Sequence, residues 1–201
     1  MAGALLYLLH VVLGGFLWTG YNHLMQPISD LTAAGAPNKD LLGVITLLYG
    51  ICSIIFCTGA FAYLKHFAPG IAKAGILVFL AMHIVSLLYG FFPEDLAGSA
   101  VTFTGTMHIV ITALIVPLTI LAPFFVGFGL RKIEEFEAIG KYSIITGILI
   151  LIAGSASAIF FANTLPYFGL VERINIGALQ LWMFILSMKL YRTHYHYICE
   201  I

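Results

Sequence analysis

The sequence contains few charged residues. Of its 201 residues, 9% are Asp, Glu, Lys or Arg and 61% are hydrophobic, whereas a soluble domain carries roughly 25% charged and 45–50% apolar residues. We therefore expect an integral membrane protein. Nine Lys and Arg balance nine Asp and Glu, and this zero net charge excludes a strongly basic nucleic-acid binder.

Cysteine is also scarce. The three cysteines, Cys52, Cys57 and Cys199, are too few for a disulfide framework, and the first two lie within an apolar segment where neither an oxidant nor a metal is expected. The N-terminus lacks the basic region of a secretory signal, and its apolar stretch exceeds the usual length of roughly 7–15 residues. We expect it to be kept as a first span.

The sequence is rich in long apolar segments. Each is long enough to cross about 30 Å of hydrocarbon, although the sixth is near the short limit. The segments are continuous and about twice as long as the strands of a transmembrane barrel. We therefore expect an all-α fold, a single membrane domain over residues 1–201 that forms a six-transmembrane-helix bundle with short loops. The expected spans are 3–25, 41–64, 71–92, 107–130, 142–163 and 174–191.

The positions of Lys and Arg predict how the bundle is oriented. Short connections that carry these residues stay in the cytoplasm. The first, third and fifth connections hold only Lys39 and Arg173, which predicts that they lie outside and that both termini are cytoplasmic. The remaining Lys and Arg residues lie at the second and fourth connections and at the C-terminal end: Lys65, Lys73, Arg131, Lys132, Lys141, Lys189 and Arg192.

Titratable side chains gather in the three outer connections. They are His23, Asp30, Asp40, Glu94, Asp95, His108, Glu172 and Arg173. Two imidazoles and two carboxylates, from His23, His108, Asp30 and Asp95, suit zinc or acid–base catalysis of hydrolysis or acyl transfer. Their spacing matches no metal or hydrolase motif, so no metal site is assigned and zinc is kept as an alternative.

The outer loops also permit a structural interpretation. Ser29 or Asp30, and likewise Asp95, could cap a short interfacial helix. Three short connections on a compact bundle have little other surface to occupy, so we expect the first and third outer loops to come together. Arg173 could bind a lipid phosphate through two hydrogen bonds, or form an anchor pair with Glu172.

Several polar or small residues lie deeper in the spans. His10 and His83 are expected to be neutral, and each either bonds a neighbouring carbonyl or hydroxyl or lines a path for protons or solutes. No Asp or Glu lies deep in a span, which disfavours an ion-coupled transporter. Gly154 and Ala158 allow close helix contact, within the bundle or in a homodimer.

The outer-loop residues resemble a known family. The matching strings are Ile28-Ser29-Asp30-Leu31, Gly35-Ala36-Pro37-Asn38, Phe92-Pro93-Glu94-Asp95, Met107-His108 and Gly169-Leu170-Val171-Glu172-Arg173. They resemble the six-span prokaryotic membrane proteins grouped as domain of unknown function 998. That group is distantly similar to the damage-regulated autophagy modulators, some of which are tied to lipid remodelling or lipid-dependent regulation. The resemblance singles out Ser29, Asp30, Pro93, Asp95, His108, Glu172 and Arg173 without indicating a substrate.

These observations predict an outward-facing polar site that binds or modifies a lipid or amphiphile in a prokaryotic cytoplasmic membrane. Whether the protein is an enzyme stays open. For catalysis, His108 would be the base or ligand, Asp95 or Asp30 its partner, and Ser29 a further candidate. Arg173, Glu172, His23 and Glu94 would contact the ligand. The alternatives are a small-solute or proton transporter that uses His10 and His83, and a regulatory or scaffold protein without chemistry.

Overall fold

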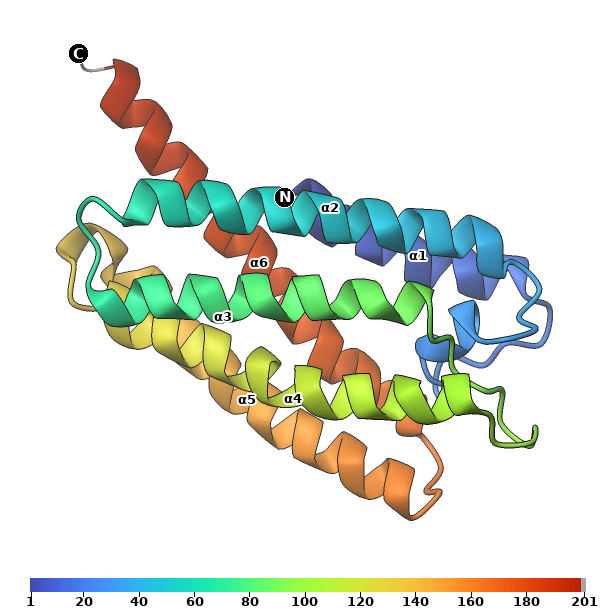
Figure 1. Ribbon diagram of the computed structural model, residues 1–201. Coiled ribbons are helices and arrows are strands. Elements are labelled where there is room, and N and C mark those ends of the chain that lie inside the picture. The colour runs from blue at the N-terminus through green and yellow to red at the C-terminus, as the bar shows by residue number, and fades with distance from the viewer. Residues whose placement is uncertain (200–201) are drawn as a thin grey trace.

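The computed structural model describes residues 1–199. This part of the chain is helical, with one isolated bridge and no strand, so the all-α prediction is confirmed. Six α-helices follow one another along the chain (Figure 1): α1 (Ala2–Leu17), α2 (Lys39–Leu64), α3 (Gly70–Ser86), α4 (Phe103–Leu130), α5 (Glu137–Ala162) and α6 (Phe168–Cys199). Three 3₁₀ helices lie between them: η1 (Ser29–Thr32), η2 (Leu87–Gly90) and η3 (Glu134–Phe136).

Five of the helices are long and apolar enough to cross a membrane, namely α2 to α6. The first helix is the exception. With 16 residues it rises about 24 Å, less than the roughly 30 Å of hydrocarbon. The expectation of a short sixth span is wrong, because α6 has 32 residues and includes Glu172 and Arg173, whose polar groups find partners inside the protein. Helix α1 ends at Leu17, and the next residue, Trp18, has extended backbone dihedrals.

Large apolar side chains cover the outside of the bundle. Phe16, Ile55 and Ile145 are 83%, 64% and 64% exposed. A soluble protein rarely exposes so much contiguous apolar surface, whereas lipid chains are a favourable surrounding for it. The exposed surface therefore supports membrane insertion independently of helix length.

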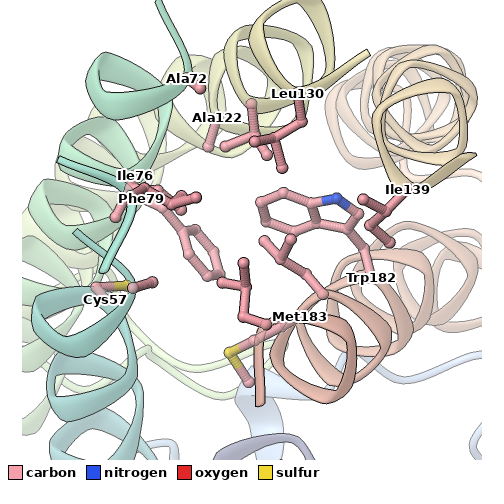
Figure 2. Close-up of a cluster of buried hydrophobic side chains, with 14 of the residues drawn as sticks. Cys57, Ala72, Ile76, Phe79, Ala122, Leu130, Ile139, Trp182 and Met183 are labelled. Atoms are coloured by element: carbon pink, nitrogen blue, oxygen red, sulfur yellow. The ribbon is translucent and has the colours of Figure 1, made fainter. Parts of the chain in front are cut away.

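The main core cluster is formed by buried side chains of α2, α3, α4, α5 and α6. Phe79 and Trp182 point toward each other in Figure 2, with ring centroids 5.1 Å apart. The indole nitrogen of Trp182 donates a hydrogen bond to Ser143 Oγ at 2.8 Å, so the polar atom of this buried ring has a partner. A Cβ at Gly129 would collide with the backbone of Ala72, which shows how closely α3 and α4 approach.

The connections form two ends of the bundle. One end, here called the loop end, consists of residues 18–38, 91–102 and 163–167; the other consists of residues 65–69 and 131–136. Figure 1 shows these two groups at opposite sides of the molecule. Helix α1 begins part-way along α6, since the Met1 amine donates a hydrogen bond to Ser187 Oγ at 2.8 Å.

Candidate functional site

The first and third connections meet at the loop end, as expected. The backbone N–H of Ala34 donates a hydrogen bond to the carbonyl oxygen of Glu94 at 2.8 Å, and Ala34 and Asp95 form the isolated bridge. The side chain of Ser29 also hydrogen-bonds that of Glu94. These bonds join two chain segments that are more than 50 residues apart.

Arg173 holds the loop end together from the start of α6. Its Nη1 donates hydrogen bonds to the carbonyl oxygens of Gln26, at 2.7 Å, and Gly169, at 2.9 Å. Its Nη2 donates to Tyr21 Oη, and the guanidinium carbon lies 5.6 Å from the centre of the Tyr21 ring. The Nε atom is buried without a hydrogen-bond partner, so the guanidinium retains a free donor.

Glu172 and Arg173, considered as an anchor pair, form no salt bridge in the described structure. The salt bridges within residues 1–199 join other residues. Glu172 Oε2 instead accepts a hydrogen bond from the backbone N–H of Ile28 at 2.6 Å. Because Ile28 is the residue just before η1, Glu172 supplies the acceptor that this helix start needs.

Asp30 and Glu94 form the acidic part of the loop end. Asp30 is only 3% exposed, and Gln26 Nε2 donates a hydrogen bond to its Oδ2 at 3.3 Å. Burial, and then the neighbouring charge of Glu94, raise the pKa of Asp30 to about 6. Burial also raises the pKa of Glu94, whose Oε2 has no hydrogen-bond partner. Both carboxyls therefore favour the protonated form more than exposed ones do.

The four side chains considered as alternative zinc ligands, those of His23, Asp30, Asp95 and His108, have separate neighbours. Asp95 accepts hydrogen bonds from the backbone N–H and the hydroxyl of Thr102, at 2.7 and 2.8 Å. The Nδ1–H of His108 donates to the Phe92 carbonyl oxygen at 3.0 Å. The ring of His23 lies 5.1 Å from that of Tyr21, and burial lowers its pKa. The described part of the chain places no three His, Cys, Asp or Glu where they could hold a metal ion.

The capping interpretation also needs correction. Ser29 and Asp30 lie inside η1, which has no side-chain cap. Thr102 caps α4 by accepting a hydrogen bond from the backbone N–H of Gly105 at 3.1 Å. Asp95 contributes to the cap indirectly, because it accepts hydrogen bonds from Thr102, the capping residue.

The two deep histidines occupy different surroundings. His10 hydrogen-bonds the backbone of Leu42, which fits the structural interpretation. His83 is fully buried, with ring centroids 4.5 Å from Phe79 and 5.4 Å from Tyr49. Neither of its nitrogens has a hydrogen-bond partner in the described structure.

A groove of about 470 Å³ separates α1 from α6. We call it the α1–α6 groove. Leu5, Leu8 and Leu181 along it are 56%, 59% and 55% exposed, so it opens on the lipid-facing surface. Polar side chains enter it at Arg173, near the loop end, and at Gln180. The lining residues are Ala4, Leu5, Tyr7, Leu8, Val11, Ile28, Arg173, Ile176, Gly177, Gln180, Leu181 and Phe184.

A family model described as "Protein of unknown function (DUF998)" matches residues 1–189. The chain belongs to the DUF998 family. Neither a curated protein nor a solved structure matches it. The resemblance to domain of unknown function 998 is thereby confirmed, while the similarity to the autophagy modulators stays a prediction.

The matched region of this DUF998 protein includes every residue of the groove. Sequence reasoning missed three of the residues that shape the site, namely Tyr21, Gly177 and Gln180. Gln180 carried a signal, because an amide within the apolar string Gly177-Ala178-Leu179-Gln180-Leu181-Trp182 needs a partner at membrane depth. Gly177 and Tyr21 carried none, since their roles depend on how α1 and α6 pack.

Proposed function

We propose that this DUF998 protein binds a lipid or another amphiphile in the α1–α6 groove. The head group lies at the loop end against Arg173, and the hydrocarbon chain runs along α6 toward Phe184. The membrane is the cytoplasmic membrane of a prokaryote, with the loop end outside. The observation that carries the proposal is a largely apolar groove of about 470 Å³ that has Arg173 at its loop end.

The energetics favour a ligand that carries an oxygen acceptor. The guanidinium of Arg173 lines the groove, and its positive charge favours an ester, carboxylate or phosphate oxygen beside it. The groove volume of about 470 Å³ lies within the range of small-molecule sites, roughly 300–1,000 Å³. From Arg173 to Phe184 the helix rises about 16 Å, which leaves room for a long hydrocarbon chain.

The site geometry supports binding more directly than it supports catalysis. Ser29 bonds Glu94, and His108 bonds a backbone carbonyl, so the two residues have partners other than each other. A hydrolase would need a nucleophile and a base within hydrogen-bonding reach.

Filling the groove tests the proposal. A Cβ at Gly177 would meet open space within 4 Å, so Gly177→Leu places an apolar side chain in the groove without disturbing the bonds of Arg173. We expect native mass spectrometry of the protein, purified in mild detergent, to show a retained lipid in wild type. Retention should fall at least about tenfold in the variant, the equivalent of 1.4 kcal/mol.

Gly59→Leu is the matched control, because Gly59 also faces open space but lies on α2 outside the groove. It should retain lipid as wild type does. Arg173→Ala removes the proposed head-group contact and should also lower retention. Tyr21→Phe controls for loosening of the loop end, because it removes the hydrogen bond between Tyr21 and Arg173 but keeps the guanidinium. Equal retention by wild type, Gly177→Leu and Arg173→Ala would refute binding in this groove.

A further inference from the structure

The α1–α6 groove ends beside a group of acidic side chains. Arg173 and Ile28 line the groove at this end. The backbone N–H of Ile28 donates to Glu172 Oε2, and the carbonyl oxygen of Gln26 accepts from Arg173 Nη1. The side chain of Gln26 in turn donates a hydrogen bond to Asp30 Oδ2. Hydrogen bonds therefore connect two lining residues of the groove with two of the acidic side chains.

Negative charge outweighs positive charge at this end of the groove. The carboxyls of Asp30, Glu94 and Glu172 act on one another, and the charge of Arg173 acts on Asp30 and Glu172. One guanidinium can offset only one of three carboxylates. Within residues 1–199, the other titratable side chains that act on this group come from α1, the first connection, η2 and the third connection: Tyr7, Tyr21, His23, Tyr89 and Asp95. Of these five, only His23 can carry a positive charge.

A negatively charged head group beside Arg173 would add to this excess. The guanidinium would attract it, while ionised Asp30 and Glu94 would repel it. Binding would therefore favour protonation of the two carboxyls, and by reciprocity their protonation would strengthen binding. Burial raises the pKa of Asp30 to about 6 and also raises that of Glu94. Both carboxyls therefore accept protons at a higher pH than exposed ones do.

We propose that the α1–α6 groove binds an amphiphile with a negatively charged head group together with a proton, and that Asp30 or Glu94 accepts this proton. The inference rests on the proposed function and adds the charge of the ligand and the control of its binding by pH. The proton comes from solvent, resides on a carboxylate oxygen while the ligand is bound, and returns to solvent when the ligand leaves. An uncharged amphiphile would bind without it.

His23 is the other group that could make anion binding depend on pH. Its protonated ring would place a second positive charge near Arg173. Burial, and then the charge of Arg173, lower the pKa of His23. The ring also packs closely against Gly15, where an added Cβ would collide with it. The test must therefore separate the two carboxyls from His23.

The test compares two probes with the same chain on the full-length protein in an uncharged detergent. Hexadecyl sulfate is negatively charged throughout the pH range, and hexadecanol is uncharged. Isothermal titration calorimetry should show that wild type binds hexadecyl sulfate about tenfold more tightly at about pH 5 than at about pH 8, the effect of one charge roughly 10 Å away in a protein. Binding of hexadecanol should be the same at both pH values. At about pH 6.5, the heat of hexadecyl sulfate binding should also change with the ionisation enthalpy of the buffer, because protons are taken up.

Two variants identify the group that takes up the proton. The double variant Asp30→Asn with Glu94→Gln has neutral amides at both positions, so it should bind hexadecyl sulfate at both pH values as tightly as wild type does at about pH 5. Asp40→Asn, at an exposed position in the first turn of α2, is the control and should keep the wild-type pH dependence. A full pH dependence in the double variant would assign it to His23 or Glu172 and overturn the proposal.

The outcomes separate this inference from the proposed function. If wild type binds both probes, and hexadecyl sulfate equally at both pH values, the coupling to a proton is overturned and lipid binding in the groove stands. If neither probe binds and Gly177→Leu retains lipid as wild type does, the groove itself is rejected. The pH comparison in wild type needs no variant, so misfolding of the double variant would not obscure it.

Discussion

At the residue scale, Asp30 shows how a membrane protein can bury a carboxyl group outside the spans. The charges of Glu94, Glu172 and Arg173 act on it, so one guanidinium and two other acidic side chains lie close enough to interact with Asp30. Gln26 supplies one hydrogen bond to the carboxyl. A second ionised carboxylate at this position would be repelled by the others, so protonation of Asp30 favours the folded loop end.

Stability should therefore depend on pH through Asp30. Its pKa is raised on folding from 3.8 to about 6, so its stabilising contribution is complete below about pH 4 and is lost as pH rises through about 6. We expect the melting temperature in detergent to fall over this pH window in wild type and to fall less in Asp30→Asn. At neutral pH, the effect of the Asp30 carboxyl on the free energy of unfolding should be about 1–3 kcal/mol.

Asp40→Asn, at an exposed position near the same end, serves as the control for that measurement and should melt as wild type does. Glu94 also has a raised pKa, so the double variant with Glu94→Gln should show the flattest profile. If the melting temperature of the double variant falls with pH as steeply as that of wild type, Asp30 and Glu94 do not cause the pH dependence.

At the element scale, the start of α4 depends on a chain of two side chains. Asp95 binds Thr102, and Thr102 caps the helix by accepting from Gly105. Thr102→Val keeps the shape and removes the cap, so it should destabilise the protein by about 1 kcal/mol. Faster amide hydrogen exchange over residues 95–106 would report the loss locally.

Thr106→Val is the matched control, since the Thr106 hydroxyl donates only to the carbonyl of Thr102 within the helix. Its effect should stay within about 0.5 kcal/mol. If the two valine variants exchange alike, the hydroxyl of Thr102 does not stabilise the helix start.

The apolar segments of the sequence predicted the helices well, because hydrophobic length is a direct requirement of the bilayer. Their ends were harder to predict. The expected first span ran through Trp18 and His23 to residue 25, whereas α1 ends at Leu17. The expected sixth span omitted Glu172 and Arg173 as too polar, yet both belong to α6. Their partners come from the first connection, and hydropathy cannot indicate contacts so distant in the chain.

At the scale of the whole molecule, the candidate site too was predicted only in part from the sequence. The sequence indicated that the first and third connections meet and that Arg173 could hold a ligand. It did not indicate the groove, because most of the lining comes from α1 and α6, at opposite ends of the chain. Composition alone cannot predict which faces of two apolar helices leave a space between them.

The orientation of the bundle is the last property that the whole molecule should obey. Lys39 and Arg173 are the only Lys or Arg residues in the first, third and fifth connections. The guanidinium of Arg173 is bonded within the protein. The loop end should therefore lie on the outer side of the membrane, while the end with residues 65–69 and 131–136 stays in the cytoplasm. Single cysteines at two exposed positions, Ala97→Cys and Glu134→Cys, test this in a background that lacks Cys52, Cys57 and Cys199.

An impermeant thiol reagent applied to intact cells should label Ala97→Cys. It should label Glu134→Cys only after the cells are permeabilised, because residue 134 lies at the opposite end of the bundle. Replacing Glu134 removes no Lys or Arg, and acidic residues contribute little to orientation, so the substitution leaves the signal that sets the orientation unchanged. The reverse pattern would place the head-group end of the groove in the cytoplasm, and Arg173 would then meet lipids of the inner leaflet.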